Sequence, residues 1–196
     1  MPQSSAALFF TRWLRNPRGV GSVMPSGEKL SAAMAAPAVL CRKRPVLELG
    51  GGTGTVTAAL LEQGLPPEDL IVLERDSGLH DYLCTKFPKV RVLQADAAYA
   101  SAALHDEGVE QVGVVVSSLP LLSMPLITRR RIVTDAFRCL ARDGFLLQFT
   151  YGPVSPIPAR MMASIGIRGR PISRVWRNVP PATVWQYERV PHARAG

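Results

Sequence analysis

Short apolar runs alternate along this chain with longer segments in which apolar residues recur every three or four positions. The runs predict buried strands and the longer segments predict amphipathic helices. Strands are expected at 46–49, 70–74, 90–94, 112–116 and 144–151, with helices between them at 55–63, 77–87, 97–104 and 127–140. A short helix at 159–165 and β segments at 172–178 and 183–189 follow. Strands that alternate with helices form a mostly parallel sheet, so we expect an α/β fold in one domain, residues 1–196.

The first predicted strand runs into a glycine-rich turn, Gly50-Gly51-Gly52-Thr53-Gly54, before a helix begins at Thr55. Glycine allows a tight turn, and a side chain there would keep a ligand from the amides at the start of the helix. Parallel α/β sheets bind their ligands at this edge, outside the carboxyl ends of the strands. The turn therefore predicts a binding site.

Acidic residues follow the next two strands. Glu74 ends the second strand, 20 residues beyond Gly54. A carboxylate in that position can accept hydrogen bonds from both ribose hydroxyls of a nucleoside. Asp96 follows the third strand, where it can accept a hydrogen bond from an adenine amino group, cap the helix that begins at Ala97, or do both. With the glycine turn, these acids predict a nucleoside cofactor.

The fourth strand opens into a loop, Ser117–Pro125, that contains two prolines and three serines. The loop leaves the carboxyl end of a central strand, so we expect it to lie where a transferred group would sit. Tyr151 ends the fifth strand at the same edge of the sheet. The run Arg129–Arg131 near the start of the following helix is expected to be a solvated face that can also touch anionic lipid.

The N-terminal segment 5–15 has the pattern of an amphipathic helix. The residues of its aromatic face and basic flanks are Phe9, Phe10, Arg12, Trp13 and Arg15. Such a helix either packs on its own domain or lies in a membrane interface, with the rings in lipid and the arginines on phosphates. Arg18 and Ser22 belong to a glycine-containing loop that suits a phosphate or a linker.

A second N-terminal helix is expected over 26–35, capped by Ser26. We expect residues 1–40 to cover the membrane or substrate side of a core formed by 41–196. The net charge of +8 is concentrated at the two ends of the chain, and the middle is mildly acidic. Basic ends suit nucleic acid or an anionic membrane. Three scattered cysteines favour a reduced, cytoplasmic compartment, and neither a secretory signal nor a membrane span is evident.

The order of strand, glycine turn, helix and acids resembles the class I S-adenosylmethionine-dependent methyltransferases. The resemblance implies a Rossmann-like, mostly parallel seven-stranded sheet flanked by helices, and S-adenosylmethionine as the cofactor, with S-adenosylhomocysteine as the product. It also implies the cofactor-binding residues, which are Glu48, Gly50, Gly52, Thr53, Gly54, Glu74, Asp96, Ala97 and Ser117. A nicotinamide enzyme fits less well, because Thr57 stands where the dinucleotide motif has its third glycine.

Several further segments resemble the bacterial phospholipid N-methyltransferases, from about Leu8 to Arg189. These segments are 13–18, 20–26, 117–125, 148–152 and 175–182. The resemblance implies a monomeric enzyme on the inner face of the bacterial cytoplasmic membrane that methylates phosphatidylethanolamine towards phosphatidylcholine, without a metal or nucleic acid. One small departure is Gly51, where this family often has proline; we expect the turn to accept either residue.

The acceptor site is assigned from this resemblance together with the strand ends. Ser117 and Tyr151 are expected to line the amine site. Arg18 and Arg177 are candidates for the lipid phosphate, with Ser22 beside them. Trp176 is expected either to pack in the core or to hold the methylated amine by cation–π contact.

Two other functions remain open on the sequence. An RNA adenine dimethyltransferase has a similar glycine motif and would suit the charge, but its Asn-Leu-Pro-aromatic loop is absent: residues 117–121 read Ser-Ser-Leu-Pro-Leu. A non-catalytic protein at the membrane that binds S-adenosylmethionine as a sensor is the other alternative.

Overall fold

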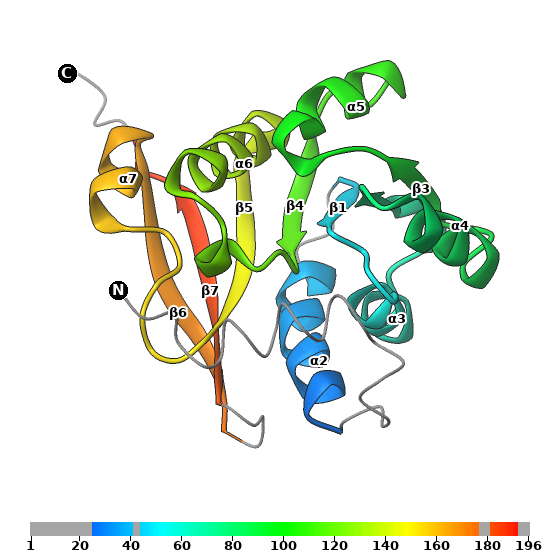
Figure 1. Cartoon of the computed structure of the whole chain (residues 1–196), viewed down its shortest axis with the longest axis horizontal. Coiled ribbons are helices and arrows are strands. Elements are labelled where there is room, and N and C mark those ends of the chain that lie inside the picture. Colours follow the sequence, from blue (N-terminus) through cyan, green and yellow to red (C-terminus); the bar gives the residue numbers. More distant parts are fainter. Residues whose placement is uncertain (1–24, 41–43, 177–180, 192–196) are drawn as a thin grey trace.

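The structure, a computed structural model, describes residues 25–40, 44–176 and 181–191. Its seven strands form one sheet in the order β3-β2-β1-β4-β5-β7-β6 (Figure 1). They are β1 (Val46–Leu49), β2 (Leu70–Glu74), β3 (Arg91–Gln94), β4 (Val112–Ser117), β5 (Leu140–Tyr151), β6 (Ile167–Val175) and β7 (Ala182–Arg189). The first five are parallel, and β7 pairs antiparallel with both β5 and β6. The predicted Rossmann-like, mostly parallel sheet is confirmed.

Helices cover both faces of the sheet (Figure 1). One layer holds α2 (Pro25–Leu40), α3 (Thr55–Glu62) and α4 (Ser77–Lys86), whose apolar side chains share one core cluster. The other holds α5 (Ala100–Asp106), α6 (Leu126–Cys139) and α7 (Ala159–Ser164), which share the second cluster. Short 3-10 turns are η1 (Pro67–Asp69), η2 (Ala97–Tyr99) and η3 (Leu121–Ser123).

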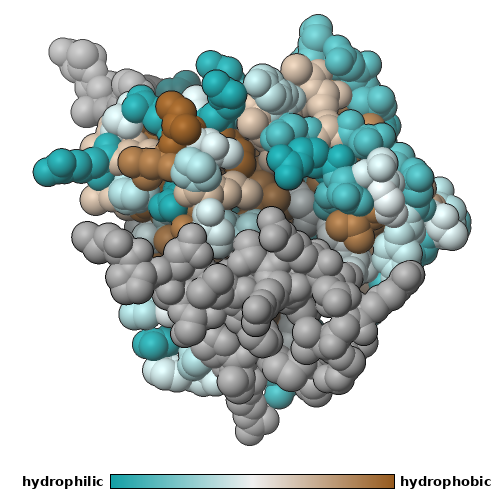
Figure 2. All heavy atoms as spheres, in the orientation of Figure 1, coloured by the Kyte–Doolittle hydropathy of each residue, from teal (hydrophilic) through white to brown (hydrophobic). Residues whose placement is uncertain are grey.

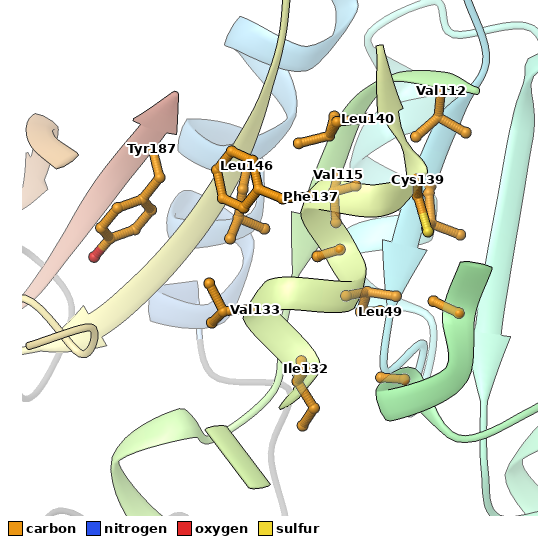
Figure 3. Close-up of a cluster of buried hydrophobic side chains, with 14 of the residues drawn as sticks. Leu49, Val112, Val115, Ile132, Val133, Phe137, Cys139, Leu140, Leu146 and Tyr187 are labelled. Carbon is orange, nitrogen blue, oxygen red and sulfur yellow. The ribbon is translucent and has the colours of Figure 1, made fainter. Parts of the chain in front are cut away.

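The central strands are buried along their whole length because both of their faces are covered. Every residue of β1 and of β2 is buried. Successive side chains alternate between the two faces. Thus Leu49 of β1 packs beneath α6, in the cluster of Figure 3, and its neighbour Glu48 points to the layer of α2 and α3.

The chain reverses its direction of winding between β1 and β4. It moves outward from β1 to β2 and β3, and then returns to β4 on the other side of β1. Loops that leave two adjacent strands in opposite directions open a crevice at the carboxyl edge of the sheet. The glycine turn after β1 and the loop after β4 border that crevice.

The largest differences from the predicted element boundaries are in β5, β6 and α2. β5 begins at Leu140 and not at Gly144, directly after α6, and its register with β4 shifts between Val112 and Val114. β6 begins at Ile167, five residues early, and contains Pro171; an edge strand tolerates proline because one side has no ladder to complete. The helix predicted over 26–35 is α2, which extends to Leu40, five residues beyond the prediction.

The N-terminal helix expected over residues 5–15 lies outside the described residues. Within the described part, no helix is long and apolar enough to cross a bilayer.

Candidate functional site

The glycine turn is fixed by backbone hydrogen bonds to the neighbouring strand. The Gly50 and Gly51 amides both donate to the Leu73 carbonyl of β2, at 2.9 and 3.3 Å. The Gly54 amide closes the turn on the Gly51 carbonyl at 2.8 Å. Gly50, Gly52 and Gly54 all have positive φ, between 54° and 79°, a region that residues with a Cβ enter at a cost.

Packing explains two of these glycines better than access of a ligand does. A Cβ on Gly50 would lie 2.6 Å from Leu119 Cδ2, and one on Gly54 would lie 2.4 Å from the Phe87 ring. A Cβ on Gly52 would meet nothing within 4 Å. Within the turn only Gly52 faces open space, so the predicted close approach of a ligand to the backbone is expected at that position.

Gly51 is also packed closely. A Cβ there would approach Val72 Cγ1 to 2.5 Å and Leu83 Cδ1 to 2.7 Å. A proline would in addition lose the amide hydrogen bond to Leu73. A proline at this position would therefore require Val72 and Leu83 to shift.

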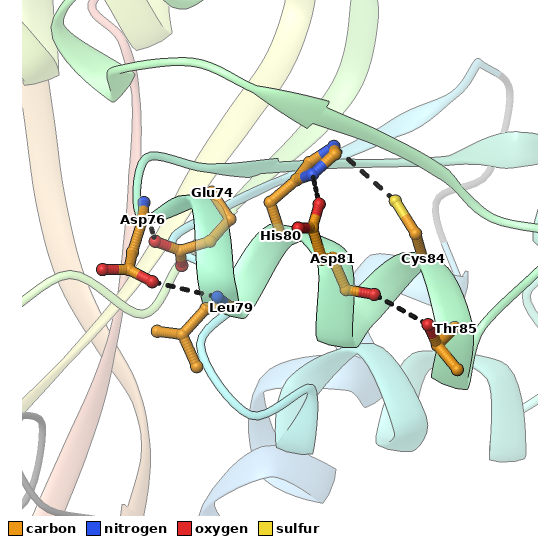
Figure 4. Close-up of polar contacts among 7 residues, drawn as sticks. All are labelled: Glu74, Asp76, Leu79, His80, Asp81, Cys84 and Thr85. Atoms are coloured by element: carbon orange, nitrogen blue, oxygen red, sulfur yellow. Dashed lines mark hydrogen bonds and ion pairs between the residues drawn. The ribbon is translucent and has the colours of Figure 1, made fainter.

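Glu74 connects the glycine turn to the start of α4. Its Oε2 accepts from the Gly52 amide and its Oε1 from the Asp76 amide, each at 2.9 Å, and the side chain is nearly buried. Asp76 in turn caps α4 by accepting from the Leu79 amide (Figure 4). A carboxylate has about four acceptor positions, so Glu74 keeps capacity for two hydroxyl donors.

Glu48 is fully buried beneath the turn. Its Oε2 accepts from Thr57 Oγ1 at 2.7 Å, and its Oε1 has no hydrogen-bond partner. Burial raises the pKa of Glu48 to about 8, and the charge of Glu74 adds to the rise against the opposing hydrogen bond from Thr57. At pH 7 Glu48 is therefore mostly a neutral carboxylic acid, which can donate a hydrogen bond as well as accept one.

Asp96 caps η2, as one of its two predicted roles requires. Its Oδ1 accepts from the Ala98 amide at 2.9 Å, and its Oδ2 lies 3.5 Å from Arg75 Nη1. Ala97, the first residue of η2, is buried. In the glycine turn, the Thr53 carbonyl accepts from Lys86 Nζ at 3.1 Å.

Ser117 ends β4 between the partners Leu49 of β1 and Gln148 of β5. It is buried, and its Oγ accepts from the Leu119 amide at 3.4 Å. Tyr151, three positions beyond Gln148, packs edge-to-face on Phe149 in the α2 layer. By strand alternation Ser117 points to the opposite, α6 layer, so the structure does not bring Ser117 and Tyr151 together on one face.

Three buried side-chain oxygens at the ends of β4 and β5 have no hydrogen-bond partner. They are Ser118 Oγ, Gln148 Oε1 and Thr150 Oγ1. The Gln148 amide nitrogen donates to the Leu119 and Phe149 carbonyls, at 3.0 and 2.9 Å, which fixes the direction of its oxygen. The sequence prediction did not single out these residues; the available signal was a pair of polar residues two positions apart within an apolar strand.

The Arg129 side chain is held by hydrogen bonds to backbone carbonyls and is not part of a solvated face. Its Nη1 donates to the Pro156 carbonyl at 2.9 Å, and its Nη2 lies 3.3 Å from the carbonyls of Leu122 and Met124. Burial lowers the pKa of this guanidinium. The prediction of a fully solvated arginine run is wrong at this position, and Arg130 and Arg131 are exposed as expected.

Trp176 is two-thirds exposed at the end of β6 and does not pack in the core. The Arg174 guanidinium lies 3.9 Å from its ring centroid, so one ring face is already covered. The other predicted lipid-binding residues lie outside the described residues. They are Phe9, Phe10, Arg12, Trp13, Arg15, Arg18, Ser22 and Arg177.

No group of three or more metal-ligating side chains occurs among residues 25–40, 44–176 and 181–191. The residues at the glycine turn do fit a nucleoside cofactor. Gly52 leaves open space, Glu74 and Asp96 hold acceptors at the ends of β2 and β3, and Glu48 has a buried oxygen without a partner.

The chain is similar to the ornithine lipid N-methyltransferase of Singulisphaera acidiphila. The two are 30% identical over 149 residues, which cover 74% of this chain and 78% of the relative. No protein-family model matches the chain.

Among solved structures, the chain resembles a TehB-like S-adenosylmethionine-dependent methyltransferase from Corynebacterium glutamicum, with a TM-score of 0.64 and 18% identity over 94% of this chain and 98% of that one. It also resembles the magnesium protoporphyrin IX methyltransferase of Synechocystis with bound S-adenosylmethionine, with a TM-score of 0.66 and 14% identity over 94% and 93%. The agreement at these identities is one of fold.

Proposed function

Because the chain belongs to the bacterial lipid N-methyltransferases, within the class I S-adenosylmethionine-dependent methyltransferases, we propose that it methylates the amine of phosphatidylethanolamine towards phosphatidylcholine. The observation that carries the proposal is the identity with a lipid N-methyltransferase over three-quarters of the chain. The basic ends of the chain add support, since a cationic protein is attracted to anionic membranes.

On the cofactor side, formed by the glycine turn and the ends of β1, β2 and β3, the proposed contacts follow the geometry. Glu74 accepts the ribose hydroxyls, and Asp96 with Ala97 holds the adenine. Gly52, which faces open space, lets the ligand approach the backbone, and Gly50, Thr53 and Gly54 shape that turn. The buried Glu48 lies beneath the methionine part.

On the acceptor side, formed by the loops after β4 and β5, the amine has to be aligned with the methyl group. S-adenosylmethionine supplies a methyl group that its sulfonium already activates. Alignment of reactants contributes roughly 7–11 kcal/mol to such reactions. We place the amine beside Ser117 and Gln148, whose oxygens can accept its N–H bonds and direct its lone pair. Tyr151 borders the same edge from the α2 layer.

The amine must lose a proton before it can attack. An alkyl ammonium has a pKa near 10, as in lysine, so it arrives charged at neutral pH. Gln148 Oε1 and the Ser117–Leu119 segment offer neutral acceptors that hold and orient the ammonium on arrival, and water takes up its proton. The rate of methyl transfer is therefore expected to rise with pH.

An ornithine lipid is the second candidate acceptor, because the relative at 30% identity is named for it. Both headgroups offer a primary alkyl amine in a membrane surface, so the same alignment serves either. The protein is proposed to act as a monomer on the inner face of the cytoplasmic membrane. Residues 5–15 are proposed to lie in the lipid interface, and Arg18, Ser22 and Arg177 to contact the lipid headgroup.

An acceptor panel tests this function. Purified protein receives S-adenosylmethionine with a labelled methyl group and, in separate reactions, vesicles with phosphatidylethanolamine, vesicles with ornithine lipid, or ribosomal RNA. We expect label in the phosphatidylethanolamine fraction. Label in ornithine lipid alone would replace the substrate and keep the reaction class. Label in RNA and not in lipid would contradict the proposal, and binding of S-adenosylmethionine without transfer would indicate a sensor.

A further inference from the structure

Arg129 joins the two loops that leave the acceptor side of the sheet. Its guanidinium donates to carbonyls of Leu122 and Met124, in the loop between β4 and α6, and of Pro156, in the loop between β5 and α7. These loops lie side by side below α6 in Figure 1. One side chain thus fixes the spacing of two loops that are far apart in the sequence.

Exposed apolar side chains occur in these two loops, at the start of α6 and at the end of β6. Five of the nine large apolar residues that are exposed in the described part of the chain belong to this region. They are Leu122, Leu126, Ile127, Val154 and Trp176, here called the apolar rim. Figure 2 shows hydrophobic side chains exposed among hydrophilic ones over α6 and α7. Such a gathering on one part of a soluble surface marks an interaction site.

Two hydrogen bonds place the end of the β6–β7 hairpin beside the start of the loop after β5. The Gly152 amide, at the start of the loop after β5, donates to the Pro181 carbonyl at 3.1 Å, and Thr183 Oγ1 donates to the Gly152 carbonyl at 2.8 Å. The end of the β6–β7 hairpin, which carries Trp176, therefore borders the segment that carries Val154. The Arg174 guanidinium on the Trp176 ring adds a cation at this end.

The chain around the apolar rim is cationic. No Asp or Glu occurs in residues 111–134, which contain three arginines, or in residues 144–187, which contain five. An RNA-binding surface would share this charge, but it does not require protruding aliphatic side chains. Aliphatic side chains, a tryptophan and arginines together are the composition of surfaces that enter a lipid interface.

We propose that the apolar rim is a docking surface for an anionic bilayer, which places lipid headgroups at the carboxyl ends of β4 and β5. The inference rests on the proposed lipid substrate and adds the part of the folded core that meets the membrane. The Arg129 contacts hold the two loops in a fixed position relative to each other, so that Ile127 and Val154 enter the interface together. A lipid amine then reaches the Ser117 region without leaving the bilayer.

The test compares a rim variant with a control variant. Ile127→Ser with Val154→Ser removes two strongly exposed apolar side chains from the rim. Leu40→Ser with Val190→Ser removes two exposed aliphatic residues elsewhere, at the end of α2 and after β7. Partition is measured by sedimentation with vesicles of phosphatidylglycerol and phosphatidylethanolamine. We expect about a tenfold weaker partition for the rim variant and no change for the control, from loss of buried apolar area.

A second readout does not depend on these variants. With Trp13→Phe and Trp185→Phe, Trp176 is the only tryptophan left in the chain. Its fluorescence should be quenched by vesicles with brominated acyl chains. Unchanged partition of the rim variant together with unquenched Trp176 would overturn the inference. A rim variant that loses binding to polyuridylate but keeps its binding to vesicles would overturn it as well.

Methyl transfer separates this inference from the proposed function. Towards phosphatidylethanolamine with short acyl chains, dissolved below its micelle concentration, the rim variant should keep the native kcat/KM. An equal loss on dissolved and vesicle substrates would place Ile127 and Val154 in the amine site and overturn the docking role. If the native protein methylates no lipid but docks through the rim, the proposed function fails and the docking surface stands.

Discussion

The cofactor side and the acceptor side of this sheet differ in how completely their polar groups are paired. On the cofactor side both oxygens of Glu74 accept backbone amides and Asp96 caps η2, so that Glu48 Oε1 is the one buried oxygen described there without a partner. On the acceptor side the buried oxygens of Ser118, Gln148 and Thr150 have no partner, and apolar side chains protrude from the loops.

This difference separates the hydrogen bonds that the fold itself completes from those left for the proposed acceptor. The cofactor side is held by contacts within the protein, as expected for a pocket that many methyltransferases share. The acceptor side leaves hydrogen-bonding capacity and apolar surface, which the proposed lipid acceptor would fill. Buried polar atoms are usually satisfied in proteins, so a cluster without partners marks where a bound group supplies them. The two sides are therefore expected to respond separately to mutation.

Replacing Glu74 should have the largest effect. Glu74→Ala removes the proposed acceptor of two ribose hydroxyls, and hydrogen bonds to charged groups contribute about 2 kcal/mol each. We expect the Kd for S-adenosylmethionine to rise by about a thousandfold in isothermal titration calorimetry. The exposed acid Glu68 provides the control, because Glu68→Ala should leave the Kd unchanged. A change of less than threefold for Glu74→Ala would contradict the assigned role.

Two glycines of the turn should differ in stability. Gly54→Ala combines positive φ with a Cβ 2.4 Å from Phe87, so we expect a loss of about 3 kcal/mol in the free energy of unfolding. Gly52→Ala has only the positive φ, which costs about 1 kcal/mol. Chemical denaturation measures both values. Equal losses would mean that packing does not distinguish the two positions.

The buried Glu48 should make stability depend on pH. Its pKa is about 8 in the folded protein and about 4.5 in the unfolded chain, so between these values only the folded protein keeps the proton. Unfolding then releases a proton, and stability falls as pH rises from about 5 to 8. Relative to Glu48→Gln, which has no such proton, we expect the native protein to lose roughly 3–4 kcal/mol over that window. Parallel pH profiles for both proteins would contradict this.

Arg129 should have the smallest effect, confined to the acceptor side. Arg129→Lys keeps the charge but cannot reach carbonyls of both loops at once. We expect a loss of about 1 kcal/mol in stability and a higher KM for lipid, with the Kd for S-adenosylmethionine unchanged. The matched control is Arg130→Lys next to it on the exposed face of α6, for which all three quantities should stay the same.

Much of the cofactor side was predictable because its signals are local. The strand 70–74, the glycine turn, the start of α3 at Thr55 and the cap of Asp96 were each read from adjacent residues. Apolar runs identify strands that are buried on both faces, and side-chain caps act within three residues.

The structure of the acceptor side depends on contacts between residues far apart in the sequence, which no local sequence pattern reveals. The early start of β6 was hidden by Gly169, which packs against Tyr187, and by Pro171 on the sheet edge. The separation of Ser117 and Tyr151 onto two faces follows from the register of β4 with β5. The inward turn of Arg129 depends on a loop 27 residues away. Each of these requires the sheet to be assembled first.

The most direct test of the account is methyl transfer to lipid, measured with the native protein and with Glu74→Ala in parallel. Vesicles of phosphatidylethanolamine and phosphatidylglycerol are incubated with methyl-labelled S-adenosylmethionine, and the extracted lipids are analysed by mass spectrometry. We expect labelled methyl groups on the ethanolamine nitrogen with the native protein and almost none with the variant. Native protein that binds S-adenosylmethionine but leaves every lipid amine unlabelled would contradict it.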